Sequence, residues 1–354
     1  MISIPETELL RMMADDGARE VSFYGEVLSD GVPVKKVSCS GTVDLDTTAE
    51  IQRTASLAFS EELDWLDVEI RAVEEVNGKA YPLGIFIPSS PTENENSSGR
   101  KSYSVECYDR TIRLKQSGLR EPLLLKAGTP YLDAVQQIAA KAGAGDILVK
   151  DDGLFTLPSD RIFERGSSRL AIINTLLDEI NYQPISCSAD GTFIIEAFRE
   201  EIPEQAGIAY NSTSCRALAP EYSSMLDAFH VPNVFFVTVS GLKQEGSFSS
   251  QYINDDPDSP FSTVRRGMEI VMELEPPSAI GSQEELDMWC RRKAMEMTDI
   301  SETITFKTLT MPIHEAGDYI SLDYKGHTGL YQETGWTIPL QAGSVMTHKA
   351  RKVL

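Results

Sequence analysis

The sequence has no long apolar run and no recognisable export signal. Within its 354 residues, no apolar stretch approaches the roughly 20 residues that a membrane-spanning helix needs. The first residues, MISIPETELLRMMADDGARE, lack the basic start, apolar core and small-residue cleavage site of a secretion signal. We therefore expect a protein without a membrane segment that is synthesised in a cytoplasm.

Paired cysteines are also missing. Five single thiols lie along the chain without a C-x-x-C pair or a histidine at ligand spacing, namely Cys39, Cys107, Cys187, Cys215 and Cys290. This pattern predicts buried thiols in a reducing compartment rather than a disulfide framework. The histidines stand apart as well, at His230, His314, His327 and His348. Folding can bring such distant residues together, but no short spacing predicts a metal site.

Positive charge is scarce. The chain has 32 Lys and Arg against 54 Asp and Glu, which gives a net charge of −22. The basic cluster near the end, Lys349, Arg351 and Lys352, is too small to offset this charge. The balance argues against a protein that grips nucleic-acid phosphates. It is compatible with a solvated surface, and also with an acidic channel wall past which DNA slides without sticking.

Enzymatic motifs are absent too. The sequence contains no G-x-S-x-G, no H-E-x-x-H and no Walker pattern, and AGAGD at 142–146 is typical of a helix end. Glu61, Glu62 and Asp64 near Trp65 superficially resemble a glycosidase pair, but an acidic turn before a strand is commoner. We expect no enzyme, no catalytic residue and no cofactor.

Alternating strand patterns fill the first 117 residues. Runs at 21–27, 34–46, 51–59 and 68–76 alternate apolar and polar residues, and Asn77-Gly78 is a strong hairpin signal. A short helix is predicted over 5–15. Two further strands flank the polar loop PTENENSSGR, and Tyr103, Val105 and Cys107 share one face of the second strand.

The remainder mixes helices and strands. Thr129 and Pro130 begin one predicted helix, and a second follows Ser168 and precedes a hairpin with an Asp190-Gly191 turn. After 206, strands such as NVFFVTV and MEIVMELEP precede a helix at 283–297, for which Ser282 and Glu285 form a capping box. At least three more antiparallel strands follow.

The ordered set GTVDLD, RTASLAF, YPLGIF and CYDR resembles phage tail-hub or baseplate-hub proteins, which connect the tail tube to the tip. The block with LL..INY and the segment NDDPDSPFS support this resemblance. It implies a β-rich α+β fold with two tail-tube-like β-barrel domains and flanking helices, at 1–117 and 206–354. A small α+β module at 118–205 would separate them.

The resemblance also implies partners and a location. The chain would form a homotrimer whose two similar domains per copy mimic the six-fold symmetry of the tube. Further partners would be the tail tube protein, distal tail or baseplate proteins, the spike or tip protein and the tape measure protein, while DNA would only pass through the channel. The protein would be made in the bacterial host and reside in the tail tip or baseplate of the virion.

Two polar loops are the expected assembly contacts. We predict that Pro91–Gly99, with Glu93 and Glu95, projects toward neighbouring proteins, as does Asp255–Ser259, with Asp255, Asp256 and Asp258. These three aspartates could instead bind a hard cation, but Pro257 interrupts them and no closing Glu follows, so a solvated turn is expected.

Two alternatives remain open. A receptor- or carbohydrate-binding tail protein would show aromatic residues such as Trp65, Trp289 and Trp336 on an exposed face. A tail-associated hydrolase would need a carboxylate or Cys/His cluster in a cleft.

Overall fold

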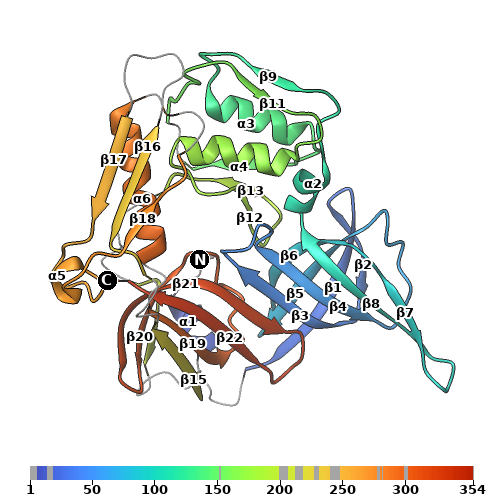
Figure 1. Ribbon diagram of the computed structural model, residues 1–354. Helices are drawn as coiled ribbons and strands as arrows, with labels where there is room; N and C mark the ends of the chain where they lie inside the picture. Colours follow the sequence, from blue (N-terminus) through green and yellow to red (C-terminus); the bar gives the residue numbers. More distant parts are fainter. Residues whose placement is uncertain are drawn as a thin grey trace.

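The computed structural model describes residues 6–13, 19–150, 153–198, 206–211, 218–226, 231–239, 248–276, 280, 282–298 and 302–353. Most of its strands join a single 14-stranded sheet, and three smaller sheets and the helices α1–α6 complete it (Figure 1). None of the described helices is long and apolar enough to cross a membrane. The predicted β-rich α+β class is confirmed.

The first β-rich half contains α1 and the strands β1 to β8. Their bounds are α1 Glu6–Met13, β1 Val21–Ser29, β2 Val32–Val37, β3 Cys39–Asp46, β4 Arg53–Phe59, β5 Glu69–Val76, β6 Lys79–Pro88, β7 Thr92–Glu95 and β8 Lys101–Asp109. The strands pair in the order β3-β4-β8-β6-β5-β1-β2, and β7 pairs with β8. The Asn77-Gly78 hairpin is confirmed, because both residues adopt positive φ and join β5 to β6.

The inward face of β8 is also as predicted. Tyr103, Val105 and Cys107 are buried, and the residues between them face outward. In β4 the same alternation buries Ala55, Leu57 and Phe59, but it also buries Arg53. A charged side chain on the core face of a strand needs partners inside the protein.

The second β-rich half contains β14, β15 and β19 to β22. The bounds are β14 Ile208–Asn211, β15 Leu218–Leu226, β19 Glu302–Leu309, β20 Tyr319–Tyr324, β21 His327–Pro339 and β22 Val345–Lys352. The order β15-β19-β22-β21 continues into the first half, because β21 pairs with β3 and places Trp336 opposite Leu45. One hydrophobic core therefore includes residues of both halves.

The main strand path of the sheet has two ends, and β7 and the pair β14-β20 branch from it. Among the described residues, β2 pairs only with β1 and β15 only with β19, so the strand path is open. The two closed barrels that the resemblance implied are not found in this part of the chain.

A middle module with its own core follows the first half. It contains α2 Thr111–Gln116, β9 Leu123–Leu125, α3 Tyr131–Ala140, β10 Ile147–Val149, β11 Arg161–Phe163, α4 Arg169–Glu179, β12 Ser186–Cys187 and β13 Phe193–Ile195. Both predicted helices are present. Ser168 Oγ accepts a hydrogen bond from the backbone N–H of Ala171 and so caps α4, whereas α3 has Pro130 rather than Thr129 as its N-cap.

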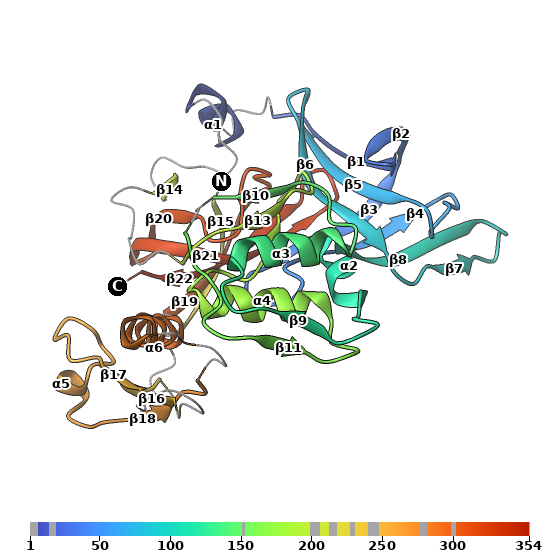
Figure 2. The ribbon, with the colours of Figure 1, turned by 90° about the horizontal axis from the view of Figure 1, so that it is seen from above.

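A third core forms what we call the α6 unit. It contains β16 Val234–Val239, β17 Phe248–Ile253, α5 Thr263–Arg266, β18 Val271–Glu273 and α6 Gln283–Thr298. The predicted helix at 283–297 is confirmed, and Ser282 Oγ accepts a hydrogen bond from the Glu285 N–H as the capping box requires. In both views this unit lies beside the large sheet rather than in it (Figures 1 and 2).

The described residues thus form three hydrophobic clusters, one of which the first and last segments share. The division at 117/118 and 205/206 stays a prediction.

Candidate assembly interface

The loop Pro91–Gly99 extends the sheet as an arm. Here β7 pairs with the beginning of β8, and the resulting hairpin projects away from the body of the protein (Figures 1 and 2). Glu93 and Glu95 are exposed on it, and Glu93 forms an ion pair of 2.7 Å with Lys101 across the hairpin. The side chain of Asn96 accepts hydrogen bonds from the backbone N–H groups of Ser98 and Arg100, which shapes the turn. The arm is therefore ordered, polar and exposed, while its contact with a neighbour stays a prediction.

The second predicted loop, Asp255–Ser259, lies on the α6 unit between β17 and α5. Asp255, Asp256 and Asp258 are exposed, and Asp256 Oδ1 accepts a hydrogen bond of 2.9 Å from the Asp258 N–H. The carboxylate of Asp256 is thus used to shape its own turn. This loop and the β7 arm lie at opposite ends of the molecule (Figure 2).

The two ends of the main strand path, β2 and β15, also present apolar side chains to solvent. Val34 on β2 and Met225 on β15 are both 63% exposed, and Val32 and Tyr222 accompany them. Unpaired edges of this kind are templates for pairing with another chain. The sequence analysis did not single them out, because the edge position of a strand is set by pairings between distant segments.

Residues of the motifs RTASL and CYDR meet at the joint between the halves. The guanidinium of Arg53 donates hydrogen bonds to the Leu83 carbonyl at 2.7 Å and to Glu315 Oε2 at 2.5 Å. It also lies 5.3 Å from the centre of the Trp336 ring. Asp109 accepts a hydrogen bond from the Arg53 backbone N–H at 3.2 Å. Arg53 therefore links β4 and β6 to the second half, because Glu315 and Trp336 belong to that half.

The next residue of the motif, Arg110, connects the joint to the middle module. Its guanidinium donates two hydrogen bonds to Glu69, at 2.9 and 2.6 Å, and one of 3.2 Å to the Gly191 carbonyl. Glu315 also reaches the module, because its Oε1 accepts from the Ala189 N–H at 3.4 Å. The residues that carried the resemblance thus hold the parts of the fold together.

The segment 310–315, between β19 and β20, contacts every part of this joint. At one end, Thr310 Oγ1 donates to Glu74 Oε1 at 2.5 Å, and Arg19 contacts the same carboxylate. Burial raises the pKa of Glu74 to about 7, although Thr310 and Arg19 oppose the shift. At the other end of the segment, Glu315 accepts the hydrogen bond from Arg53.

His314 in this segment belongs to a buried polar cluster that the sequence analysis missed. His314 Nδ1 lies 2.6 Å from Glu333 Oε2 and His348 Nδ1 lies 2.5 Å from Glu333 Oε1. The other ring nitrogens face hydroxyl groups, His314 Nε2 that of Tyr210 and His348 Nε2 that of Thr308, each at 2.8 Å. All five side chains are buried.

The pKa values of the two histidines are shifted in opposite directions. Burial alone would raise the pKa of Glu333, but the two histidines lower it to about 2, so it is a carboxylate. Burial lowers the pKa of His314, and Glu333 outweighs this effect and raises it above its ordinary value. For His348, burial outweighs Glu333 and the pKa stays below its ordinary value. The carboxylate thus favours the protonated form of His314, whereas burial favours the neutral form of His348.

The cluster has the donor types of a zinc site but not its spacing. The ligand atoms of His314, Glu333 and His348 lie within 4.8 Å of one another. Two ligands of one tetrahedral Zn²⁺ are separated by roughly 3.3 Å, given bonds of about 2.0–2.1 Å. The observed separations of 2.6 and 2.5 Å are those of hydrogen bonds. The sequence did contain one indication of this cluster. Glu333 and His348 are polar residues at positions where the alternating pattern of β21 and β22 places side chains in the core.

The three tryptophans do not form an exposed aromatic face. Trp289 and Trp336 are buried, and Trp65 is half-buried against Phe59 and Tyr103. The described cysteines, Cys39, Cys107, Cys187 and Cys290, are free and buried, as predicted. His230 and Cys215 lie outside the described residues.

No protein-family model matches this sequence, and no curated protein matches it. Solved structures match it over most of its length. A tail protein from Neisseria meningitidis superposes with a TM-score of 0.68 at 14% identity, covering 94% of this chain and 97% of its own. The 43 kDa tail protein of prophage MuSo2 from Shewanella oneidensis gives 0.64 at 9%, covering 93% and 98%. The prophage tail protein gp18 from Listeria monocytogenes gives 0.58 at 12%, covering 93% and 94%. The chain therefore has the fold of phage tail proteins, as the sequence motifs predicted.

Proposed function

We propose that this chain is a structural protein of a phage tail tip or baseplate, where copies of it form a ring that joins the tail tube to the tip. The observation that carries the proposal is the 14-stranded sheet, which spans two β-rich halves and whose main strand path is open at β2 and β15. The similarity of fold to prophage tail proteins supports it.

The two edges suit a ring because they are different surfaces. When β2 of one copy meets β15 of the next, the contact is head to tail, and such contacts generate closed rings if the rotation closes. Pairing would satisfy the exposed backbone groups of both edges and cover Val34 and Met225. Three copies with two halves each would give the six-fold quasi-symmetry of a tube.

The remaining partners follow from this position. The tail tube protein and the distal tail, baseplate, spike or tip proteins would contact the faces of the ring. The β7 arm and the loop Asp255–Ser259 are the elements proposed to reach them. DNA and the tape measure protein would pass through the channel, and the net charge of −22 favours passage over binding. The role is structural and requires no catalytic residue.

Charge substitution at the edges tests the ring. We would measure the mass of the assembled protein by light scattering, alone and with tail tube protein, for the wild type, Val34→Glu and Met225→Glu. The matched control is Leu66→Glu, at an apolar residue that is 94% exposed outside any strand.

The expected result is a trimer for the wild type and Leu66→Glu, and a monomer for both edge variants, because each buries a charge in the interface. A wild type that stays monomeric with the tube protein, or edge variants that assemble as the control does, would contradict the proposal.

A further inference from the structure

Among the described elements, α6 covers one face of the small sheet in the α6 unit. The central strand of this sheet, β16, pairs with β17 on one side and with β18 on the other. Phe235 and Val237 of β16 pack in the same core as Leu286 and Trp289 of α6. Because side chains alternate along a strand, Val234 lies on the opposite face. Since α6 lies between this sheet and the large sheet, that opposite face points away from the body of the protein (Figure 2).

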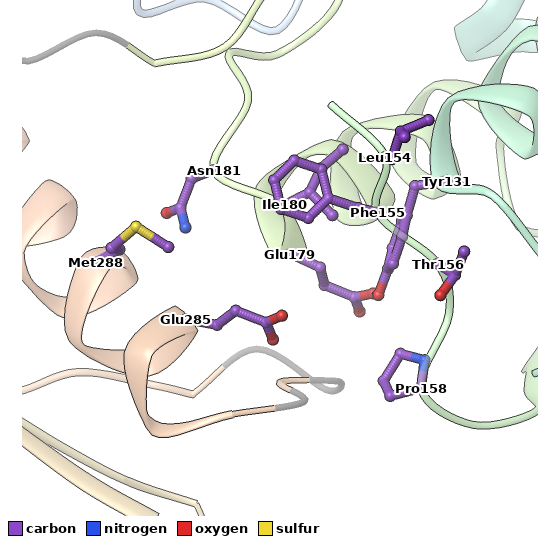
Figure 3. Close-up of a pocket in the computed structure, with 10 residues that line it drawn as sticks. All are labelled: Tyr131, Leu154, Phe155, Thr156, Pro158, Glu179, Ile180, Asn181, Glu285 and Met288. Atoms are coloured by element: carbon purple, nitrogen blue, oxygen red, sulfur yellow. The ribbon is translucent and has the colours of Figure 1, made fainter. Parts of the chain in front are cut away.

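On its other side, α6 is anchored to the middle module. Arg292 is buried and donates hydrogen bonds to Asp178 Oδ1 at 2.6 Å and to the Asp178 carbonyl at 3.2 Å. The indole N–H of Trp289 donates to Asp178 as well, at 3.1 Å. Glu285 and Met288, earlier on α6, face the end of α4 across a cavity of about 200 Å³ (Figure 3). The unit is thus held in place through α6, and its sheet presents the opposite face outward.

This outer face carries a row of apolar side chains. Val234 pairs with Ile253 on one side and with Val271 on the other, so the three residues lie side by side across the three strands. Neighbours in such a row are roughly 5 Å apart. Ile253 is 42% and Val271 is 55% exposed, and Phe236 in the next row is half-buried. The exposed apolar surface is therefore continuous across the sheet.

Two more apolar side chains extend this surface at one end of the sheet. Val264 on α5 and Met268 just after it are exposed. Their segment is bonded to the beginning of β16, because the side-chain amide of Asn233 donates hydrogen bonds to the Phe261 and Met268 carbonyls, both at 3.1 Å. Asn233 directly precedes Val234, so the segment lies at the end of the sheet that carries the apolar row.

A second helix fits this face. Positions 234–237 of β16 are all apolar, which is typical of a strand that is buried on both faces. Contiguous exposed apolar surface marks a site of interaction with another molecule. Neighbouring strands are about 4.8 Å apart, so three strands span about 10 Å, which matches the diameter of one helix. On the inner face, α6 already covers the sheet in this way.

The surroundings of the face are acidic. The span 255–275 contains six exposed carboxylates, on Asp255, Asp256, Asp258, Glu269, Glu273 and Glu275. The same span has two cations, Arg265 and Arg266, and Arg266 is directed to the Val231 carbonyl and the Phe261 ring. A second copy of this chain would bring the same carboxylates to the contact and be repelled. A partner with basic residues around an apolar stripe would be attracted.

We propose that the outer face of this sheet is the docking surface for a basic amphipathic helix of another protein. The apolar stripe of that helix covers Val234, Ile253 and Val271, and its lysine or arginine residues lie against the surrounding carboxylates. The α6 unit then becomes a three-layer structure with a helix on each face of its sheet. The proposal goes beyond the ring and does not depend on it, because the face is formed within one chain and involves neither β2 nor β15.

Peptide binding to the full-length protein tests this surface. The probe is a fluorescent designed peptide of about 18 residues, long enough to form a helix, with leucine along one face and lysine along the other. A scrambled peptide of the same composition has no apolar face, and a third peptide has glutamate in place of lysine. Fluorescence anisotropy measures the dissociation constant of each peptide.

Two pairs of double variants locate the site. Ile253→Thr with Val271→Thr removes the apolar row, and its matched control is Leu66→Thr with Leu154→Thr, at exposed apolar residues outside any strand. Glu269→Gln with Glu273→Gln removes two carboxylates near the row, and its matched control is Glu93→Gln with Glu95→Gln on the β7 arm. Threonine keeps the preference for a strand, so the thermal midpoint of the first variant should not change.

We expect the amphipathic lysine peptide to bind with a dissociation constant on the order of 10 μM, and the other two peptides to bind at least about tenfold more weakly. The variant at Ile253 and Val271 should weaken binding about tenfold and the variant at Glu269 and Glu273 about threefold, while both controls leave it unchanged. No binding, equal binding of the scrambled peptide, or equal effects of the test and control variants would overturn the proposal. The last two results would show a general attraction of lysine to an acidic protein.

Discussion

Charged residues gather in two contrasting regions of this chain, the joint between the β-rich halves and the β7 arm. At the joint, Arg53, Glu74 and Glu333 are buried, and each has partners from distant segments. On the arm, Glu93 and Glu95 are exposed, and the described ion pair of Glu93 is local to the hairpin. The joint therefore uses charge to fix how the chain folds, whereas the arm leaves its charge available to other molecules.

The largest expected effect comes from removing the carboxylate of Glu333. Glu333→Ala removes the partner of both Nδ1 atoms, and burial then lowers the pKa of His314, so two buried imidazoles lose their hydrogen bonds. This should lower the free energy of unfolding by about 3–5 kcal/mol. Urea denaturation measures it, with Thr334→Ala on the same strand as control. A loss no larger than in the control would show that the cluster does not stabilise the fold.

The raised pKa of Glu74 predicts that stability falls as the pH rises. Its pKa is raised to about 7 in the folded protein, so the stability gained from its protonated form is full below about pH 4.5 and is lost as the pH rises through 7. Glu74→Gln cannot ionise, so its stability relative to the wild type should improve between pH 5 and 8, by up to about 3 kcal/mol. Unfolding free energies measured across this range test it, and parallel curves would contradict the pKa shift.

Arg53 sharpens the comparison between buried and exposed ion pairs. Arg53→Lys replaces a fork that serves both Leu83 and Glu315 with a single ammonium, and we expect a loss of about 2 kcal/mol. The control is Arg71→Lys, because Arg71 pairs with Glu26 in a half-exposed position. That change should cost less than about 1 kcal/mol. Equal losses of stability for Arg53→Lys and Arg71→Lys in thermal unfolding would show that the buried ion pair contributes no more than the partly exposed one.

Comparing alanine variants of two glycines with the same φ distinguishes the effect of the module's contact with the first half from the effect of backbone strain. Gly191 and Gly166 both have φ of +87°, but a Cβ at Gly191 would lie 2.7 Å from Arg110 Nη1 and 2.9 Å from Ile85 Cδ1, while nothing lies within 4 Å at Gly166. Both alanine variants should lose about 1 kcal/mol from the backbone. Gly191→Ala should lose roughly 1–2 kcal/mol more through the displaced contacts. Equal thermal midpoints for Gly191→Ala and Gly166→Ala would show that Arg110 and Ile85 can move aside without loss of stability.

The smallest effect belongs to the arm. Glu93→Gln with Glu95→Gln should leave the thermal midpoint of the isolated protein unchanged, because both side chains are exposed. If the arm contacts a neighbouring tail protein, the same double variant changes the affinity for that protein. A shifted thermal midpoint in the isolated chain would show that these charges, like those at the joint, stabilise the fold.

The sequence predicted local features well and long-range ones poorly. The hairpin at Asn77-Gly78, the inward face at Tyr103 and the helix after Ser282 follow from patterns within a few residues, and the structure contains them. The separate core of the α6 unit depends on pairings such as β16 with β17 and β18, which leave that sheet outside the larger one. The cluster at His314 required residues 19 and 34 positions apart to meet, and no local pattern encodes that encounter.

The pairing of β3 with β21 has a consequence for synthesis. Leu45 and Trp336 lie opposite each other, yet almost the whole chain separates them. At about 5–20 residues per second, the ribosome needs roughly 15–60 s after making Leu45 before its partner exists. Throughout that interval one edge of β3 is unpaired while β4 is already available on the other side. The pairing of β3 with β21 therefore forms late in the synthesis of each chain, and until it forms the free edge of β3 must be kept from pairing with other chains.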